Sequence, residues 1–330
     1  SAPAAADGDG DGDSAAQPGG ETTTTAAPAD DGRDPTLGSG QAVTLAFAGD
    51  MNFEGSTGDR LAADPNSVFG PVTEDGLIEY RYIDAVKAAG SDVVAMANNH
   101  GMDYGESGFA ESLAVRDEVG FPVIGMGANE DEAFAPHVAE IKGQRIAVIG
   151  ATQVLDGSFI QSWTATDDHA GLASAKLEDR LVEEVAAARK TADTVVVFLH
   201  WGTETETCPN DAQRSLTPKL IDAGADIVVG GHQHRVASGG FSGAAFVGYG
   251  LGNFLFRANS EAGSRSGVLK VTATGRRIDD YEWIPARVNG ANQPIPAEGE
   301  AAQNLLANWN ELRGCTGLTD AATAQPEPAS

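Results

Sequence analysis

The sequence contains no apolar run that approaches the roughly 20 residues of a membrane-spanning helix. We therefore expect no such span in this chain. An apolar signal is also missing at its start, where Ser1-Ala2-Pro3 leads into a polar tract. This start predicts that any export signal has already been removed.

Basic side chains are scarce, with 21 Lys and Arg against 48 Asp and Glu and a formal net charge of −27. This deficit argues against nucleic acid as a partner, because a phosphate backbone needs a basic surface. An anionic substrate would need local cations, either a bound metal or a few Arg side chains, to overcome the general field.

The first 40 residues have little apolar content and low complexity. Asp and Gly alternate over Asp7–Asp13, and a Thr run follows at Thr22–Thr25. Such a segment cannot bury enough apolar surface to offset its ordering entropy, so we predict a disordered linker over 1–40. Calcium binding by the alternating acids is disfavoured, because the flanking helices and closing Glu of an EF-hand are missing. We place one folded domain over 41–315 and a flexible tail over 316–330.

Only two cysteines are present, Cys208 and Cys315. A single disulfide is favoured over free thiols, since an even count accompanies a linker typical of secreted proteins. A thiolate metal site is disfavoured, because such sites usually show closely spaced pairs. The disulfide would hold a C-terminal helix around Ala301–Leu312 to the loop after His200.

Four short apolar runs end in residues that bind metals or carry protons. They are Ala42–Ala48 before Asp50, Val93–Ala97 before Asn98-Asn99-His100, Val195–Leu199 before His200, and Ile227–Val229 before His232-Gln233-His234. Short Val/Ile/Leu/Phe runs are typical of buried strands in an α/β sheet. Because sites form beyond the carboxyl ends of such strands, these distant residues are expected to meet in one crevice.

The order of predicted elements is that of an α/β protein whose second half is antiparallel or mixed. Helices are expected near 79–89, 105–119, 176–191 and 211–223, with Pro218 kinking the last or starting a second helix. Further strands are expected at 92–97, 122–124, 136–141, 145–151, 194–199, 226–229, 244–249, 267–272 and 278–284.

The His232-x-His234 pair is a strong metal-ligand signal, because residues i and i+2 of an extended segment project to one side. His200 alone would more often be a hydrogen-bonded core residue, but together with that pair it becomes a candidate ligand. His137 and His169 lie in less patterned sequence, and we interpret them as surface or structural residues.

The Asn98-Asn99-His100 segment suggests acid–base chemistry beside a metal. An Asn amide oxygen can ligate a metal while the adjacent His protonates a leaving group. Asp103 could orient that imidazole or cap the following helix. Asp50 could be a ligand, with Asn52 on the same side, although for Asp50 taken alone a Gly-Asp turn at a strand end is the favoured interpretation.

These stretches resemble the CapA family of bacterial capsule and poly-γ-glutamate synthesis proteins, which is similar in fold to the calcineurin-like metallophosphoesterases. The match covers about Val43 to Pro285, and its motifs stand in the family's order. They are Phe47-Ala48-Gly49-Asp50, Ala97–Gly105, His200-Trp201-Gly202-Thr203-Glu204, Gly224-Ala225-Asp226, Gly231-His232-Gln233-His234 and Tyr249-Gly250-Leu251-Gly252-Asn253-Phe254.

The resemblance implies a four-layer α/β/β/α sandwich of the metallophosphatase type with two divalent metal ions. Asp50 and His234 would bind the first metal, and Asn99, His200 and His232 the second. Oxygen and imidazole ligands suit Mn, Fe, Zn or Mg.

By the same resemblance, His100 would be the general acid, and Asp103, from its place in the sequence, is the candidate catalytic partner that orients it. The residues lining the substrate pocket would be Asn52, Trp201, Glu204 and Asn253. The chain departs from the family in lacking an Asn-Leu-Glu stretch before the Asn-Asn-His motif, a region that helps bridge the two metals in metalloesterases. Glu54, Glu74 and Asp75 are candidate substitutes.

The resemblance implies an extracytoplasmic protein, secreted or tethered to the cell surface, that acts in capsule or poly-γ-glutamate synthesis or export. Its partners would be an anionic polymer or its precursor and a membrane-bound synthase or exporter. A metal-dependent hydrolase or transferase is one expectation. The alternative is a non-catalytic surface assembly module with a degraded metal site, which the missing stretch motivates.

Overall fold

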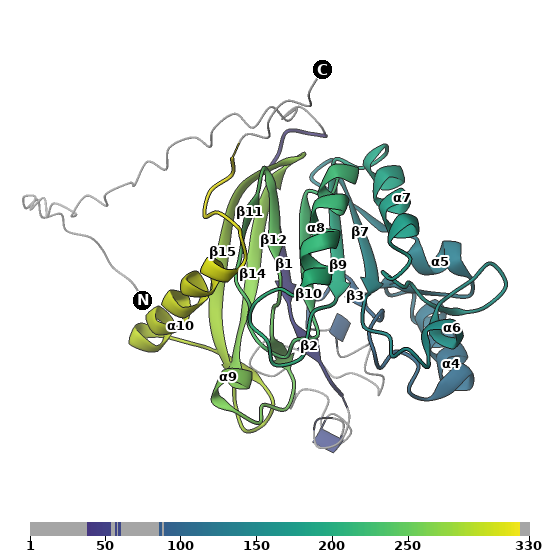
Figure 1. The fold of residues 1–330 in the computed structure, drawn as a ribbon, viewed down its shortest axis with the longest axis horizontal. Coiled ribbons are helices and arrows are strands. Elements are labelled where there is room, and N and C mark those ends of the chain that lie inside the picture. Colours follow the sequence, from purple (N-terminus) through teal and green to yellow (C-terminus); the bar gives the residue numbers. More distant parts are fainter. Residues whose placement is uncertain (1–37, 54–56, 58, 61–85, 88, 324–330) are drawn as a thin grey trace, which may run out of the picture.

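The computed structural model describes residues 38–53, 57, 59–60, 86–87 and 89–323 (Figure 1). Two sheets form its centre. One has six strands in the order β11-β12-β10-β9-β7-β6, and the other has four in the order β1-β14-β15-β16. The predicted linker lies almost entirely outside the described residues, as do Glu54, Glu74, Asp75 and most of the helix predicted near 79–89.

The six-stranded sheet is mixed. Its parallel core consists of β7 (Gln144–Thr152), β9 (Thr194–His200), β10 (Ile227–Gly231) and β12 (Ala245–Gly248). The edge strands β6 (His137–Ile141) and β11 (Gly239–Ser242) are antiparallel to their neighbours.

Two helices cover one face of this sheet. α7 (Glu178–Arg189) and α8 (Asp211–Ala223) pack apolar side chains such as Leu181 and Leu220 against Val195 and Val197 of β9. The alternate β9 residue, Val196, faces the second sheet, as the two-residue period of a strand requires.

α8 begins and ends where its sequence provides caps. Asn210 and Gln213 form a reciprocal capping box, and Gly224 takes a φ of 115° at the C-cap. The helix continues through Pro218 as a single element, so the second helix considered from the sequence does not form.

The four-stranded sheet consists of β1 (Val43–Ala48), β14 (Arg265–Thr274), β15 (Arg277–Val288) and β16 (Pro294–Pro296), all antiparallel. Its inner side chains, including Leu269 and Val271, join Ile227 and Phe246 of the other sheet in one core. The expected α/β class with two packed sheets is confirmed.

The last helix, α10 (Gly299–Leu312), lies beside β15 (Figure 1). Its Trp309 stacks on Trp283 of β15 with ring centroids 5.8 Å apart. Trp283 is the register partner of Leu269, so this contact lies on the core-facing side of the second sheet. Thr44 and Glu282, on the opposite face of that sheet from the core, remain exposed.

Shorter elements complete the described chain. The strands are β2 (Asp50–Met51), β3 (Val94–Ala95), β4 (Val123–Ile124), β5 (Met126–Gly127), β8 (Gly171–Leu172) and β13 (Asn253–Leu255). The helices are α4 (Gly105–Val119), α5 (Glu130–Phe134), α6 (Ile160–Trp163), α9 (Glu261–Ser264) and the 3₁₀ turn η1 (Arg313–Cys315). None of the described helices has the length and apolar character that crossing a bilayer requires.

The predicted disulfide is present and joins Cys208 to Cys315 across 107 residues of sequence. It connects the loop after β9 to the end of the C-terminal helix. The predicted domain end at residue 315 is too early, because Thr319 and Phe241 of β11 exchange backbone hydrogen bonds of 2.8 and 3.0 Å. Residues 316–323 therefore belong to the folded unit.

Candidate functional site

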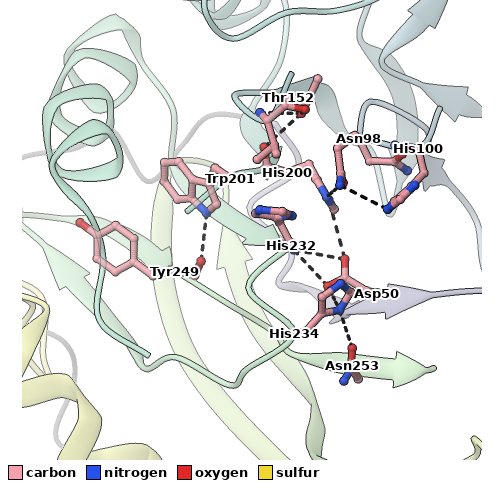
Figure 2. Close-up of polar contacts among 12 residues, drawn as sticks. Asp50, Asn98, His100, Thr152, His200, Trp201, His232, His234, Tyr249 and Asn253 are labelled. Carbon is pink, nitrogen blue, oxygen red and sulfur yellow. Dashed lines mark hydrogen bonds and ion pairs between the residues drawn. The ribbon is translucent and has the colours of Figure 1, made fainter. Parts of the chain in front are cut away.

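Two histidines leave the six-stranded sheet at the same edge. β9 ends at His200, and β10 ends at Gly231, directly before His232. The two strands are parallel neighbours with Gly231 opposite His200, so their carboxyl ends coincide. As a result the rings of His200 and His232 lie 4.8 Å apart between centroids (Figure 2).

Asp50 reaches this edge through a close contact between two glycines. A Cβ at Gly49 would lie 1.9 Å from the carbonyl oxygen of Gly252, so no residue with a side chain fits at this position. The Asp50 amide donates to the same oxygen at 2.9 Å. The Asp50 carboxylate accepts the His232 amide at 3.0 and 3.2 Å.

His234 lies on the other side of the Asp50 carboxylate. Its Nδ1 is 3.6 Å from Asp50 Oδ2 and donates to Asn253 Oδ1 at 2.7 Å. Asn253 in turn donates to the Gly263 carbonyl at 3.0 Å, which fixes the orientation of its amide. These two hydrogen bonds place the proton of His234 on Nδ1, so Nε2 is the ring nitrogen with a free lone pair.

The two histidines of this turn have backbone conformations that L-residues rarely adopt. His232 has a φ of 94° and His234 a φ of 51°. Such strain costs roughly 1–3 kcal/mol per residue and persists where the surrounding structure enforces it, most often at functional sites. The turn therefore orients both imidazoles toward the site, and the strain lowers the local stability.

The loop after β3 brings a third group to the site. Asn99 Oδ1 lies 2.8 Å from Nε2 of His200, across 101 residues of sequence. His100 Nδ1 lies 2.8 Å from Asp103 Oδ2, and both side chains are open to solvent. The exposed His–Asp pair thus lies next to Asn99, which contacts His200, and Figure 2 shows His100 near His200.

Burial favours the neutral form of two imidazoles and disfavours the charged form of the nearby carboxylate. Burial raises the pKa of Asp50, against the opposing effects of His234 and the His232 amide. Burial also holds the pKa of His200 well below its usual value, with further lowering by the neighbouring histidines. For His232, burial lowers the pKa to about 4. Neutral imidazole is the form that binds metal.

The donor set suits divalent cations. Nδ1 of His232 is buried and has no hydrogen-bond partner among the described residues, so it keeps an unsatisfied ligand atom. Carboxylate, imidazole and amide-oxygen donors together match Mn, Fe, Zn or Mg. Within the described residues, no three His, Cys, Asp or Glu side chains are arranged to hold an ion. The residues therefore fit a metal by chemistry, and the number and identity of ions stay predictions.

The four residues predicted to line a pocket have different surroundings. Trp201 is fully buried, and its Nε1 donates to the Tyr249 carbonyl at 2.9 Å, so it supports the site from within the core. Glu204 is exposed on the next loop. Asn52 is half-buried beside β13, and Asn253 positions His234.

Two further residues that hold the site together escaped the sequence reasoning. A Cβ at Gly231 would lie 2.5 Å from Asp50 Oδ1, so this glycine makes room for the carboxylate. Thr152, at the end of β7, donates to the carbonyl of His200 at 3.3 Å. The sequence has two adjacent glycines here, Gly230 and Gly231, but only the fold shows what approaches them.

Comparisons with known proteins give a consistent family match. The family described as Bacterial capsule synthesis protein PGA_cap matches residues 77–258. The chain is 34% identical over 178 residues to Capsule biosynthesis protein CapA of Bacillus anthracis, covering 53% of this chain and 42% of that protein. It is 33% identical over 215 residues to PGA biosynthesis protein CapA of Bacillus subtilis (strain 168), covering 62% and 55%.

The matches thus span about half the length of these curated relatives. Among solved structures, a hypothetical protein from Thermus thermophilus aligns with a TM-score of 0.47 at 15% identity. That alignment covers 74% of this chain and 99% of the other.

Proposed function

Since the chain belongs to the bacterial capsule synthesis protein PGA_cap family, we propose that it acts in the synthesis or export of a capsule-type or poly-γ-glutamate polymer. This membership confirms the resemblance drawn from the motifs. The polymer and the proteins that make or export it are the proposed partners.

The proposed chemistry is metal-dependent hydrolysis or group transfer. The observation that supports it is the convergence of three imidazoles, a buried carboxylate and an amide oxygen from separate segments of the chain. Asp50 and His234 would hold one ion, and Asn99, His200 and His232 the other. When bound, such ions polarise a scissile group and lower the pKa of water.

His100 and Asp103 would move the proton. The Asp103 carboxylate accepts from Nδ1 of His100, so it fixes the orientation and tautomer of the ring. Nε2 is then the atom that can hold a proton and deliver it to a leaving oxygen or nitrogen. Asn99 Nδ2 lies 3.3 Å from this nitrogen and donates to it when it carries no proton, which keeps the ring beside the ligand cluster.

We place this activity outside the cytoplasm. The disulfide between Cys208 and Cys315 supports this location, because such bonds persist in oxidising compartments. The test is the free thiol content of protein isolated from its native cells without reductant. A reduced pair would overturn this location.

Metal binding tests the central part of the proposal. We expect purified protein to carry divalent metal in elemental analysis and to lose it in His232→Ala. His137→Ala is the matched control, because that residue lies on β6, away from the site, and its variant should keep the metal. Wild-type protein that binds no divalent ion after titration would contradict the proposal.

Proton delivery has a separate test. His100→Ala should retain its metal, because the variant loses the hydrogen bond to Asp103 and no proposed metal ligand. It should still strongly lower polymer output in cells that depend on this protein. Unchanged output with metal retained would show that the protein assembles polymer without catalysis.

A further inference from the structure

Positive charge gathers next to the His234 side of the site, although the chain as a whole carries −27. Four arginines lie on the segments around α9, namely Arg235, Arg257, Arg265 and Arg287. The acidic residue among them is Glu261, at the start of α9. This local excess of cations departs from the general field of the molecule.

Two of these arginines neutralise Glu261. Arg265 Nη2 lies 3.0 Å and Arg287 Nη2 2.9 Å from its carboxylate oxygens. Hydrogen bonds from both guanidinium groups lower the pKa of Glu261, so it stays ionised and shared between them. Glu261 therefore does not offset the charge of the other two arginines.

Arg235 follows directly after the His232-x-His234 pair. Its Nη1 donates to the His234 carbonyl at 2.8 Å and lies against Gly263, where an added Cβ would come within 2.8 Å of the same atom. Gly263 also accepts from Asn253, the residue that fixes His234. The Arg235 guanidinium is thus tied to the same backbone as the metal-facing imidazole. No carboxylate pairs with it among the described residues.

Arg257 follows a residue that packs on the same imidazole. The ring of the preceding residue, Phe256, packs on His234 with centroids 4.5 Å apart. The Arg257 side chain is exposed, and the described part of the chain offers it no ion pair. Arg235 is thus next in sequence to His234, and Arg257 is next to the residue that packs on its ring. Each guanidinium group has five N–H donors, which leaves donors for a ligand.

Acidic residues lie near His232 instead. Glu204 and Glu206 are exposed on the loop after β9, and the charge of Glu204 acts on His232. This polarity would orient an anionic chain with its charged groups toward Arg235 and Arg257.

We propose that Arg235 and Arg257 form an anion-binding subsite beside His234, which takes a carboxylate or phosphate group of the polymer chain next to the bond acted on. Guanidinium groups suit this role because their planar donors bind such anions in pairs. The inference rests on the proposed function and names the group that would select its substrate.

The test compares binding of two fluorescent anionic oligomers, a short γ-linked glutamate chain and a polyphosphate chain of similar charge, by anisotropy in metal-loaded protein. Arg235→Gln and Arg257→Gln should each weaken one of them by roughly tenfold, the loss of one charged hydrogen-bonded contact. The oligomer affected identifies carboxylate or phosphate as the ligand. Arg235→Lys, which keeps the charge, should recover part of the binding.

Arg145→Gln is the matched control, since it removes the same charge from an exposed side chain at the opposite end of β7. Metal content is measured in each variant to show that the His234 turn is intact. Equal binding by the Arg145, Arg235 and Arg257 variants, or no binding of either oligomer by wild type, would overturn the subsite. Protein that holds no metal would instead contradict the proposed function, and binding of the oligomers would still be measurable.

Discussion

Two aspartates lie at opposite ends of β10, and their electrostatic surroundings differ. Asp226 comes directly before the strand, while Asp50 lies against Gly231, where the strand ends. Both carboxylates are removed from water, and such burial is costly without compensation. The comparison shows how one fold uses a buried charge for structure at one end and for a site at the other.

Asp226 is compensated by fixed cations. Its side chain is fully buried, with Arg189 Nη1 at 2.6 Å and Arg276 Nε at 3.4 Å. It also accepts the Val195 amide at 2.9 Å, which ties β10 to β9. This end of the sheet is a completed ion-pair network.

Asp50 has no Lys or Arg within ion-pair distance among the described residues. It accepts one backbone amide, and its other neighbours are imidazoles at 3.6 and 3.8 Å. A buried carboxylate with these neighbours lacks a fixed cation, and a divalent ion would supply one. Both ends of the strand have a buried aspartate. They differ in its partners, which are arginines for Asp226 and imidazoles for Asp50.

The largest expected effect is on the structural end. Asp226→Ala should lower the free energy of unfolding by about 3–5 kcal/mol, because it leaves Arg189 with an uncompensated buried charge. Chemical denaturation measures this loss, with exposed Asp222→Ala as a control that should change stability by at most about 0.5 kcal/mol. Similar values for both variants would remove the contrast.

The disulfide should affect stability without affecting the site. Cys208→Ser combined with Cys315→Ser should cost about 2–4 kcal/mol, since the bond closes a long loop. Metal content should stay unchanged, because Thr205 still donates to the Gln233 carbonyl at 2.8 Å and holds the site loop. Denaturation and elemental analysis of the same sample check both parts, and loss of metal together with stability would refute the separation.

A smaller effect is expected at the residue that orients His234. Asn253→Ala should weaken metal affinity by roughly 10–100-fold, because the imidazole loses the acceptor that fixes its tautomer. Titration calorimetry with Mn²⁺ measures the change. Asn308→Ala, which removes an amide that binds Arg265 and lies on α10, is the control and should leave affinity unchanged.

The smallest change in stability is expected at the site end. Asp50→Asn should alter the unfolding free energy of metal-free protein by no more than about 1 kcal/mol, because the charge it removes is buried without a cation. The same variant should lose the stabilisation that added metal gives the wild type. A loss as large as that of Asp226→Ala would mean that Asp50 is a structural residue.

Long periodic segments were predictable from the sequence. The helix expected over 176–191 forms as α7 and the strand expected over 194–199 as β9, both close to the predicted bounds, because their apolar patterns carry the signal of burial. The strand expected over 92–97 shortens to Val94–Ala95. The pairing of β2 with β13 was not predictable, since two- and three-residue strands have no period to detect.

Within the site, the sequence identified ligand types but not their surroundings. The His232-x-His234 spacing suggested an extended segment, yet both residues adopt positive φ. Trp201 was expected at a pocket wall and lies in the core, because its indole N–H is used by Tyr249. Conformation and burial of this kind depend on contacts with distant segments.

The amino-acid sequence alone determined which residue types follow each strand, because apolar runs and the polar groups after them are local properties. It likewise determined the net charge and the pair of cysteines. Only the tertiary structure decided that Asn99 meets His200, that Asp50 is buried without a cation, and that Arg235 adjoins the site. Those facts depend on distance and desolvation, which arise when segments far apart in sequence pack together.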